Sequence, residues 1–143
     1  MTEYSNFTID FVNRTKDILA NYKGEYETTN LINCCLGLII LPTQNIGNKI
    51  PSYTFDEKDS FYGITAKNIT YEKNNDLTLS KTLRHIRNGL AHGRIDQKAS
   101  RKKIVGLRIH DKRDEDSEEN FVIEFTTEEF KNFAVAVSKI IEL

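Results

Sequence analysis

Long apolar runs are scarce in this chain of 143 residues. The longest extends from Cys34 to Leu41, whereas a helix needs about 20 apolar residues to cross a bilayer. The first residues are polar and acidic, so we expect no secretory signal peptide. We therefore predict a cytoplasmic protein that does not contact membranes.

Cysteine is also scarce, and the two that occur, Cys34 and Cys35, are neighbours within that apolar run. Adjacent cysteines make poor disulfide partners, so we expect two buried thiols in a reducing compartment. The three histidines lack Cys, Asp or Glu at ligand spacing, which predicts no metal site. The chain has no P-loop, dinucleotide-binding or nucleophile-elbow motif, and we predict no cofactor.

An excess of either charge is missing as well, because 20 Lys and Arg oppose 21 Asp and Glu. A formal net charge of −1 gives the whole molecule no strong attraction to polyanions, so any nucleic-acid site must come from local clustering. The length predicts a single domain over residues 1–143, large enough to bury a core without disulfides or metals.

Two helices are predicted in the first part of the chain. Residues 5–22 carry an apolar face and begin at a suitable cap, Ser5. Residues 26–41 are almost entirely apolar in their second half, which places that helix in the core or partly in an oligomer interface. Pro42 is expected to end it. The face of the first helix consists of Phe7, Phe11, Ile18 and Tyr22, widened by Val12 and Leu19.

The rest of the chain predicts an irregular insertion, a hairpin and a last helix. Residues 42–77 mix Pro, Gly and Asn with aromatics, and we expect an insertion with short helical pieces near 56–62 and 64–73. After a polar connector at 96–103, alternating apolar residues predict a β-hairpin over 102–126 with a charged tip. Thr126 and Glu129 match a capping box that opens the last helix. The alternating residues are Val105, Leu107 and Ile109, then Phe121, Ile123 and Phe125.

The most informative stretch is residues 76–95, which predict a helix. Its apolar stripe consists of Leu79, Leu83, Ile86 and Leu90. Asp76 or Thr78 can cap the start, and Gly93 suits the position just past the end.

Polar side chains cover the other sides of this helix. At about 100° per residue, Arg87 and His92 lie about 140° apart. They can flank a common groove, or meet across a two-fold axis between two copies of the helix. Asn88 and His92 are i, i+4 neighbours and can touch. The residues away from the apolar stripe are Arg84, Arg87, Asn88, Ala91 and His92.

The order Arg87-Asn88-x-x-x-His92 at the end of a helix resembles the signature of the HEPN superfamily (higher eukaryotes and prokaryotes nucleotide-binding). In that signature an Arg, often followed by a polar residue, precedes a His by a few positions. Residues 26–33, ahead of an apolar helix, are similar to one prokaryotic HEPN subgroup. The predicted fold is thus mainly α, a HEPN-like four-helix bundle with a β-hairpin before the last helix.

The resemblance implies a metal-independent endoribonuclease in which Arg87, His92 and Asn88 are catalytic. The 2′-hydroxyl of RNA can attack the adjacent phosphodiester, with histidine for proton transfer and arginine for the phosphorane charge. Carbonyl dipoles at the helix end favour the imidazolium form of His92. Since one protomer supplies one such histidine, the resemblance implies a homodimer with a composite site. Asn88 would orient His92 or contact substrate.

Plainer interpretations stay open. Arg87 can be a surface residue paired with a carboxylate, and His92 a helix end stabilised by the same dipoles. His85 has no role in the HEPN signature and is expected to be exposed. Tyr53, Tyr62 and Tyr71 can stack on bases or simply pack. Further cations can guide a phosphate backbone or be solvated: Arg84, Arg94, Lys98, Arg101, Lys102 and Lys103.

Two classes of function follow from the resemblance. The first is an RNA-cleaving toxin, phage-defence effector or RNA-processing factor, with RNA, a second copy and an antitoxin or other partner protein as partners. The second is a non-catalytic HEPN-like dimeric module that binds nucleotide, nucleic acid or a partner protein. Both share one fold, so only the site can separate them.

Overall fold

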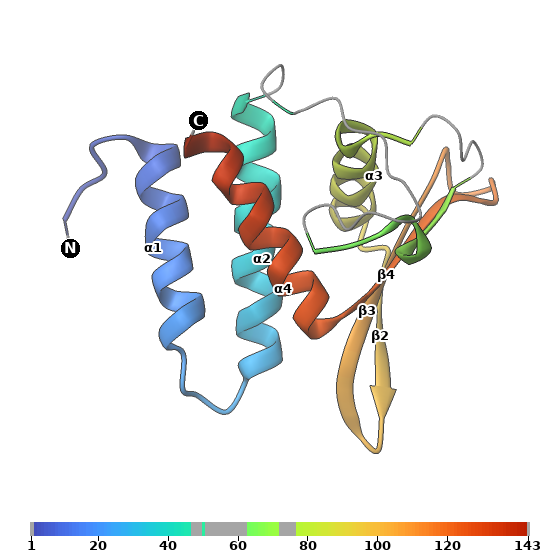
Figure 1. The fold of residues 1–143 in the computed structure, drawn as a ribbon. Helices are drawn as coiled ribbons and strands as arrows, with labels where there is room; N and C mark the ends of the chain where they lie inside the picture. Colours follow the sequence, from blue (N-terminus) through green and yellow to red (C-terminus); the bar gives the residue numbers. More distant parts are fainter. Residues whose placement is uncertain (1, 47–49, 51–62, 72–76, 143) are drawn as a thin grey trace.

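The computed structural model of the protein describes residues 2–46, 50, 63–71 and 77–142. Figure 1 shows how helices and strands follow one another. The elements are α1 (Phe7–Asn21), α2 (Glu27–Ile46), η2 (Ala66–Asn68), β1 (Ile69–Tyr71), α3 (Leu79–Ala91), β2 (Ile95–Ser100), β3 (Lys103–Lys112), β4 (Glu119–Thr126), α4 (Thr127–Ser138) and η4 (Lys139–Glu142).

The four strands of the described residues form one antiparallel sheet in the order β1-β4-β3-β2. The expected helical bundle with one added hairpin is therefore wrong, because a complete sheet occupies the middle of the chain. β3 and β4 carry the alternating burial that predicts strands. β2 replaces the expected polar connector, and every side chain after Ile95 in it is exposed. An exposed strand shows no apolar alternation, so the residues of β2 did not predict a strand.

Parts of the expected insertion over residues 42–77 form helix and strand. α2 continues past Pro42 to Ile46, although proline removes one helical donor. The helical piece expected near 64–73 is a short 3-10 turn, η2, followed by β1, which pairs with β4. Outside the described residues lie the piece expected near 56–62 and the side chains of Tyr53 and Tyr62.

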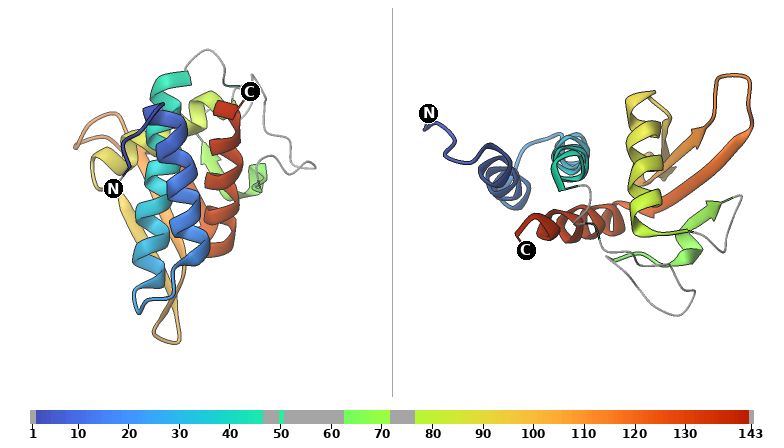
Figure 2. Two further views of the ribbon diagram at one scale, coloured as in Figure 1. Left: turned by 90° about the vertical axis from the view of Figure 1, so that its left-hand side faces the viewer. Right: turned by 90° about the horizontal axis from the view of Figure 1, so that it is seen from above.

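The helices and the sheet form separate layers, as Figures 1 and 2 show. α2 packs against α1 and α4, and α4 in turn contacts β3 and β4. α3 lies against β3 on the inner face of the sheet. Buried side chains on that inner face are Leu107, Ile109, Phe121, Ile123 and Phe125.

Gly89 lets α3 approach β3 very closely. A Cβ at Gly89 would overlap the carbonyl oxygen of His110 and lie 2.9 Å from Cγ2 of Ile109. Since there is no room for a side chain here, the helix packs directly on the strand backbone. The position of α3 on the sheet is therefore tightly fixed.

α1 leaves more apolar surface uncovered than its sequence pattern predicts. Val12 is buried, and Phe11 and Leu19 pack partly against the core. Phe7 and Ile18, however, are 58% and 55% exposed, because within the described residues this outer helix packs mainly against α2. Within the described residues, no helix is long and apolar enough to cross a membrane.

The predicted burial of Cys34 and Cys35 is confirmed, and both thiols are free. Burial raises the pKa of Cys35 to about 12 and also raises the pKa of Cys34. Because the thiolate is the reactive form, a thiol reagent should label both slowly in the native protein and rapidly in denaturant. We also expect neither to serve activity. Fast native labelling of both would contradict this prediction.

Candidate active site

The candidate site is built on α3, which starts at a side-chain cap. Oγ1 of Thr78 accepts a hydrogen bond from the backbone N–H of Lys81 at 3.2 Å. Asp76, the other expected cap, lies outside the described residues. The helix buries two neighbouring rows: the apolar row Leu79, Leu83 and Ile86, and a second row, Thr82, His85 and Gly89.

The end of α3 forms a Schellman motif. Gly93 has a left-handed φ of 69°, as predicted from the sequence, and donates to the carbonyl of Leu90 at 3.1 Å. Arg94 N–H donates to the carbonyl of Gly89 at 2.7 Å. His92 is the C-cap, so its imidazole lies at the carbonyl end of the helix.

The open side of α3 carries three basic side chains: Arg84, Arg87 and His92. His92 and Arg84 are exposed, and Arg87 is half-buried. Within the described part of the chain, no hydrogen bond or ion pair engages the side chains of Arg87 or His92. A cation and an imidazole that none of the described residues engages are available to a ligand.

Asn88 turns its amide toward the sheet. Its Nδ2 donates to Oδ2 of Asp111 across a long contact of 3.5 Å. A carboxylate only accepts hydrogen bonds, so this contact directs the NH2 group inward, and within the described residues Oδ1 accepts no hydrogen bond. No side-chain bond joins Asn88 to His92 within the described residues.

Asp111 is the centre of a buried polar network beneath the motif. It is 4% exposed, and its carboxylate accepts from Nδ1 of His85 at 2.8 Å and from Nη1 of Arg94 at 3.1 Å. The backbone N–H of Lys112 adds a third bond, at 2.9 Å. The other guanidinium nitrogen of Arg94 bonds Glu115 at 2.9 Å. The network ties β3 to both the middle and the end of α3.

The expected exposure of His85 is wrong. It is 6% exposed and stacks on Phe121, with ring centroids 4.8 Å apart, while Tyr71 lies 5.5 Å away. Its Nε2 has no hydrogen-bond partner within the described residues. One feature of the sequence indicated a buried partner for His85. Asp111 continues the inward alternation of Leu107 and Ile109, which puts an acid on the inner face of the sheet.

A family model described as HEPN pEK499 p136 matches residues 1–142. The chain belongs to the HEPN family. Comparisons with curated proteins and with solved structures give no match. The family resemblance drawn from Arg87, Asn88 and His92 is confirmed, while the helical bundle expected with it is replaced by helices and a sheet.

The further cations around the HEPN motif differ in their surroundings. Arg94 is buried and held by carboxylates, so we assign it to the support of the site and not to substrate. Lys98 is exposed but pairs with Glu124 at 2.9 Å. Exposed at the turn between β2 and β3 are Arg101, Lys102 and Lys103.

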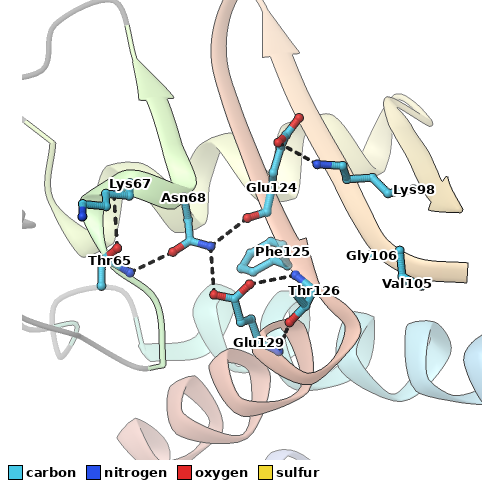
Figure 3. Close-up of a pocket in the computed structure, with 10 residues that line it drawn as sticks. All are labelled: Thr65, Lys67, Asn68, Lys98, Val105, Gly106, Glu124, Phe125, Thr126 and Glu129. Atoms are coloured by element: carbon cyan, nitrogen blue, oxygen red, sulfur yellow. Dashed lines mark hydrogen bonds and ion pairs between the residues drawn. The ribbon is translucent and has the colours of Figure 1, made fainter. Parts of the chain in front are cut away.

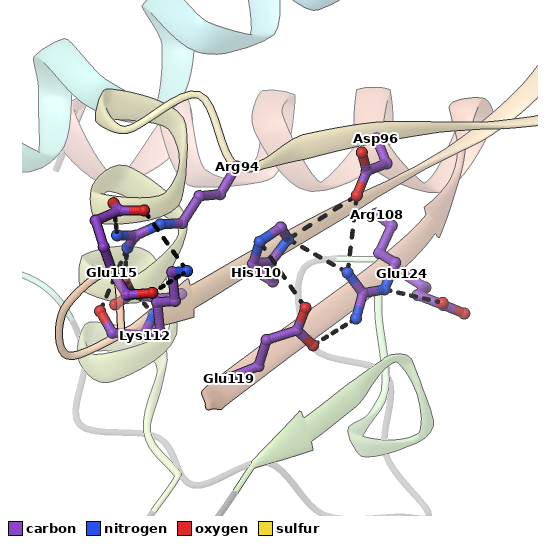
Figure 4. Close-up of polar contacts among 9 residues, drawn as sticks. Arg94, Asp96, Arg108, His110, Lys112, Glu115, Glu119 and Glu124 are labelled. Atoms are coloured by element: carbon purple, nitrogen blue, oxygen red, sulfur yellow. Dashed lines mark hydrogen bonds and ion pairs between the residues drawn. The ribbon is translucent and has the colours of Figure 1, made fainter. Parts of the chain in front are cut away.

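A second charged cluster covers the outer face of the sheet in this HEPN protein (Figure 4). Arg108 bonds Glu119 and lies 3.8 Å from Asp96 and 3.9 Å from Glu124. Its hydrogen bond lowers the pKa of Glu119, and the same bond raises the pKa of Arg108. Nδ1 of His110 lies 3.2 Å from Arg108. Carboxylates already engage the Arg108 charge, so we interpret this cluster as cross-strand support.

A pocket of about 430 Å³ lies away from the HEPN motif, where η2 meets the start of α4 (Figure 3). Nδ2 of Asn68 donates to the carbonyl of Glu124 at 2.8 Å and to Glu129 at 3.2 Å. Glu129 also closes the capping box with Thr126. These polar groups hold η2 against α4, and no motif residue lines the pocket.

Proposed function

We propose that this HEPN protein is a metal-independent endoribonuclease with a site formed by two protomers. One observation carries the proposal: Arg87 and His92 lie on the open side of α3, and no residue in the described part of the chain forms a hydrogen bond or ion pair with their side chains. Toxin, phage-defence and RNA-processing roles all fit such an activity.

The proposed reaction breaks one P–O bond and forms another. The 2′-hydroxyl loses its proton to a base and attacks the adjacent phosphorus. The 5′-oxygen leaves with a proton from an acid, and a 2′,3′-cyclic phosphate remains. The guanidinium of Arg87 stabilises the charge on the phosphorane, and exposed Arg84 contacts a neighbouring phosphate.

Two proton transfers need two groups, and each protomer supplies His92 once at this helix end. A two-fold axis beside α3 would bring two copies of His92 and Arg87 into one cleft. One imidazole then acts as base and the other as acid. Asn88 Oδ1 orients the nearer imidazole or accepts from the ribose hydroxyl.

The alternative is a non-catalytic dimeric module for nucleotide, nucleic acid or a partner protein. The exposed apolar side chains of α1 favour it, since they suit a protein partner. Incubation with total RNA in EDTA separates the two functions: the wild type should cleave, and the His92→Ala variant should not. Intact RNA with both proteins would support the module.

We predict that α3 lies in the dimer interface. A dimer through α1 would keep the two motif helices apart, because Figure 1 places α1 and α3 on opposite sides of the molecule. Ala91 is exposed beside His92, and both native thiols are buried, so an Ala91→Cys variant should form an intermolecular disulfide upon oxidation.

Ile18→Cys, on the exposed side of α1, is the matched control for this crosslink. It should stay monomeric on a denaturing gel. Crosslinking of Ile18→Cys alone, or a monomer by light scattering at micromolar concentration, would count against the composite site.

A further inference from the structure

The connected ends of β2 and β3 form an arm, Asp96–Val105, that projects from the body. Every side chain of this arm is exposed. Figure 1 shows the hairpin extending past the start of α4, to the lower edge of the view. The arm therefore buries no core residue, and packing does not explain its length.

Cations gather at the tip of the arm, on a chain whose formal net charge is −1. Lys98, nearer the body, is neutralised by Glu124. Within the described residues, no carboxylate pairs with the side chains of Arg101, Lys102 or Lys103. Three neighbouring free cations form a local site for a polyanion.

The turn holds two of these cations in an unfavourable backbone conformation. Ser100 pairs with Lys103, so Arg101 and Lys102 form a two-residue loop, with φ of 51° and 65°. Such turns strongly prefer Asn-Gly, because Gly has no Cβ, Asn tolerates positive φ, and most other side chains resist it. A chain selected only for a stable hairpin would not place Arg-Lys here.

The arm is firmly connected to the motif helix. β2 begins two residues after Gly93, and the intervening Arg94 is held by the buried Asp111 and by the backbone N–H of His110, which donates to its carbonyl at 3.1 Å. A strand rises about 3.3 Å per residue, so β2 carries the tip roughly 17 Å beyond Ile95. A stacked nucleic-acid strand has a phosphate about every 3.4 Å along its axis. The distance from Ile95 to the arm tip therefore corresponds to about five nucleotides.

We infer that the arm is a second binding site for the phosphate backbone of RNA, and that the substrate is an RNA long enough to reach from the motif to the arm tip. This inference rests on the proposed function and adds a second binding site and a minimum length of the RNA substrate. Three free cations and a strained turn favour a polyanion with a regular charge spacing over an acidic protein surface.

The test uses Arg101→Asn/Lys102→Gly in full-length protein that also carries His92→Ala, so that RNA is bound and not consumed. The change removes two cations and supplies the residues that the turn prefers, so the melting temperature should stay or rise. Affinity for a labelled long oligoribonucleotide should fall. The slope of log affinity against log salt should decrease by about 1.5. Affinity for a ribodinucleotide, which cannot span the gap, should not change.

Lys23→Gln/Lys131→Gln is the matched control, because both lysines are exposed on the helical layer and the net charge changes equally. If the arm variant and this control bind the long RNA alike, or if neither protein binds RNA, the inference is overturned. RNA that is bound through the arm but left uncut by the wild type would overturn the proposed function alone.

Discussion

The His92→Ala variant should lose about 10²–10⁴-fold of its RNA cleavage rate while it keeps its fold. Removal of a proton-transfer group typically has an effect of this size. The side chain is exposed, so its truncation opens no core cavity. Stability should change by no more than about 0.5 kcal/mol, which thermal unfolding can check. The control is His110→Ala, which removes an imidazole from the outer sheet face and should cleave like the wild type.

Arg87→Ala should cause a comparable loss, because the phosphorane then lacks its cation. Arg87→Lys keeps the charge but loses the planar fork, so it should recover only part of the rate. The losses from His92→Ala and Arg87→Ala should not add fully, since both act in one transition state. The rate of the wild type should follow a bell-shaped pH profile, with one histidine as base and the other as acid.

Two outcomes would contradict the catalytic assignment of Arg87 and His92. If both alanine variants unfold, these residues are structural and the binding module becomes the better account. If both stay folded and cleave like the wild type, any nuclease activity comes from another site or from a contaminant.

The Asp111→Ala variant should lose a large part of the free energy of unfolding. This change leaves Arg94 and His85 buried without their shared acceptor. Loss of one partner from a buried ion pair typically costs about 3–5 kcal/mol. The exposed Glu115 still holds Arg94, so we expect the lower end, about 3 kcal/mol, or about 10 °C in melting temperature.

Asp111→Asn keeps the shape and one acceptor oxygen, so it should be less destabilising than the alanine variant. Asp116→Ala, in the exposed loop after β3, is the control and should change stability by no more than about 0.5 kcal/mol. Equal stability of all three variants would show that the network contributes little.

Local patterns predicted the features of this chain that depend on local physics. The end of α3 at Gly93 follows from backbone sterics, because glycine adopts a positive φ easily. The burial of Cys34 and Cys35 follows from their apolar neighbours. The alternation in β3 and β4 is a short-range signal of the same kind. The motif itself, with Arg87 and His92 on the open side of α3, was also predicted from spacing on one helix.

Long-range pairing set the features that the sequence did not show. β1 and β2 form because β4 and β3, respectively, offer them partners: β1 is too short, at 3 residues, for its alternation to stand out, and β2 has no apolar alternation. The buried role of His85 depends on Asp111, 26 positions away in the chain. Arg94 looks like the exposed cations that follow it, and only the tertiary contact with Asp111 separates it from them.

The chemistry of the cleaved ends tests the central claim most directly. An RNA of defined sequence is incubated with the wild-type protein in EDTA, and the new ends are analysed by mass spectrometry. Attack by the 2′-hydroxyl predicts 2′,3′-cyclic phosphate ends and 5′-hydroxyl ends, and no cleavage at a linkage whose 2′-hydroxyl is replaced by hydrogen. New 3′-hydroxyl and 5′-phosphate ends, or cleavage at the 2′-deoxy linkage, would contradict the account.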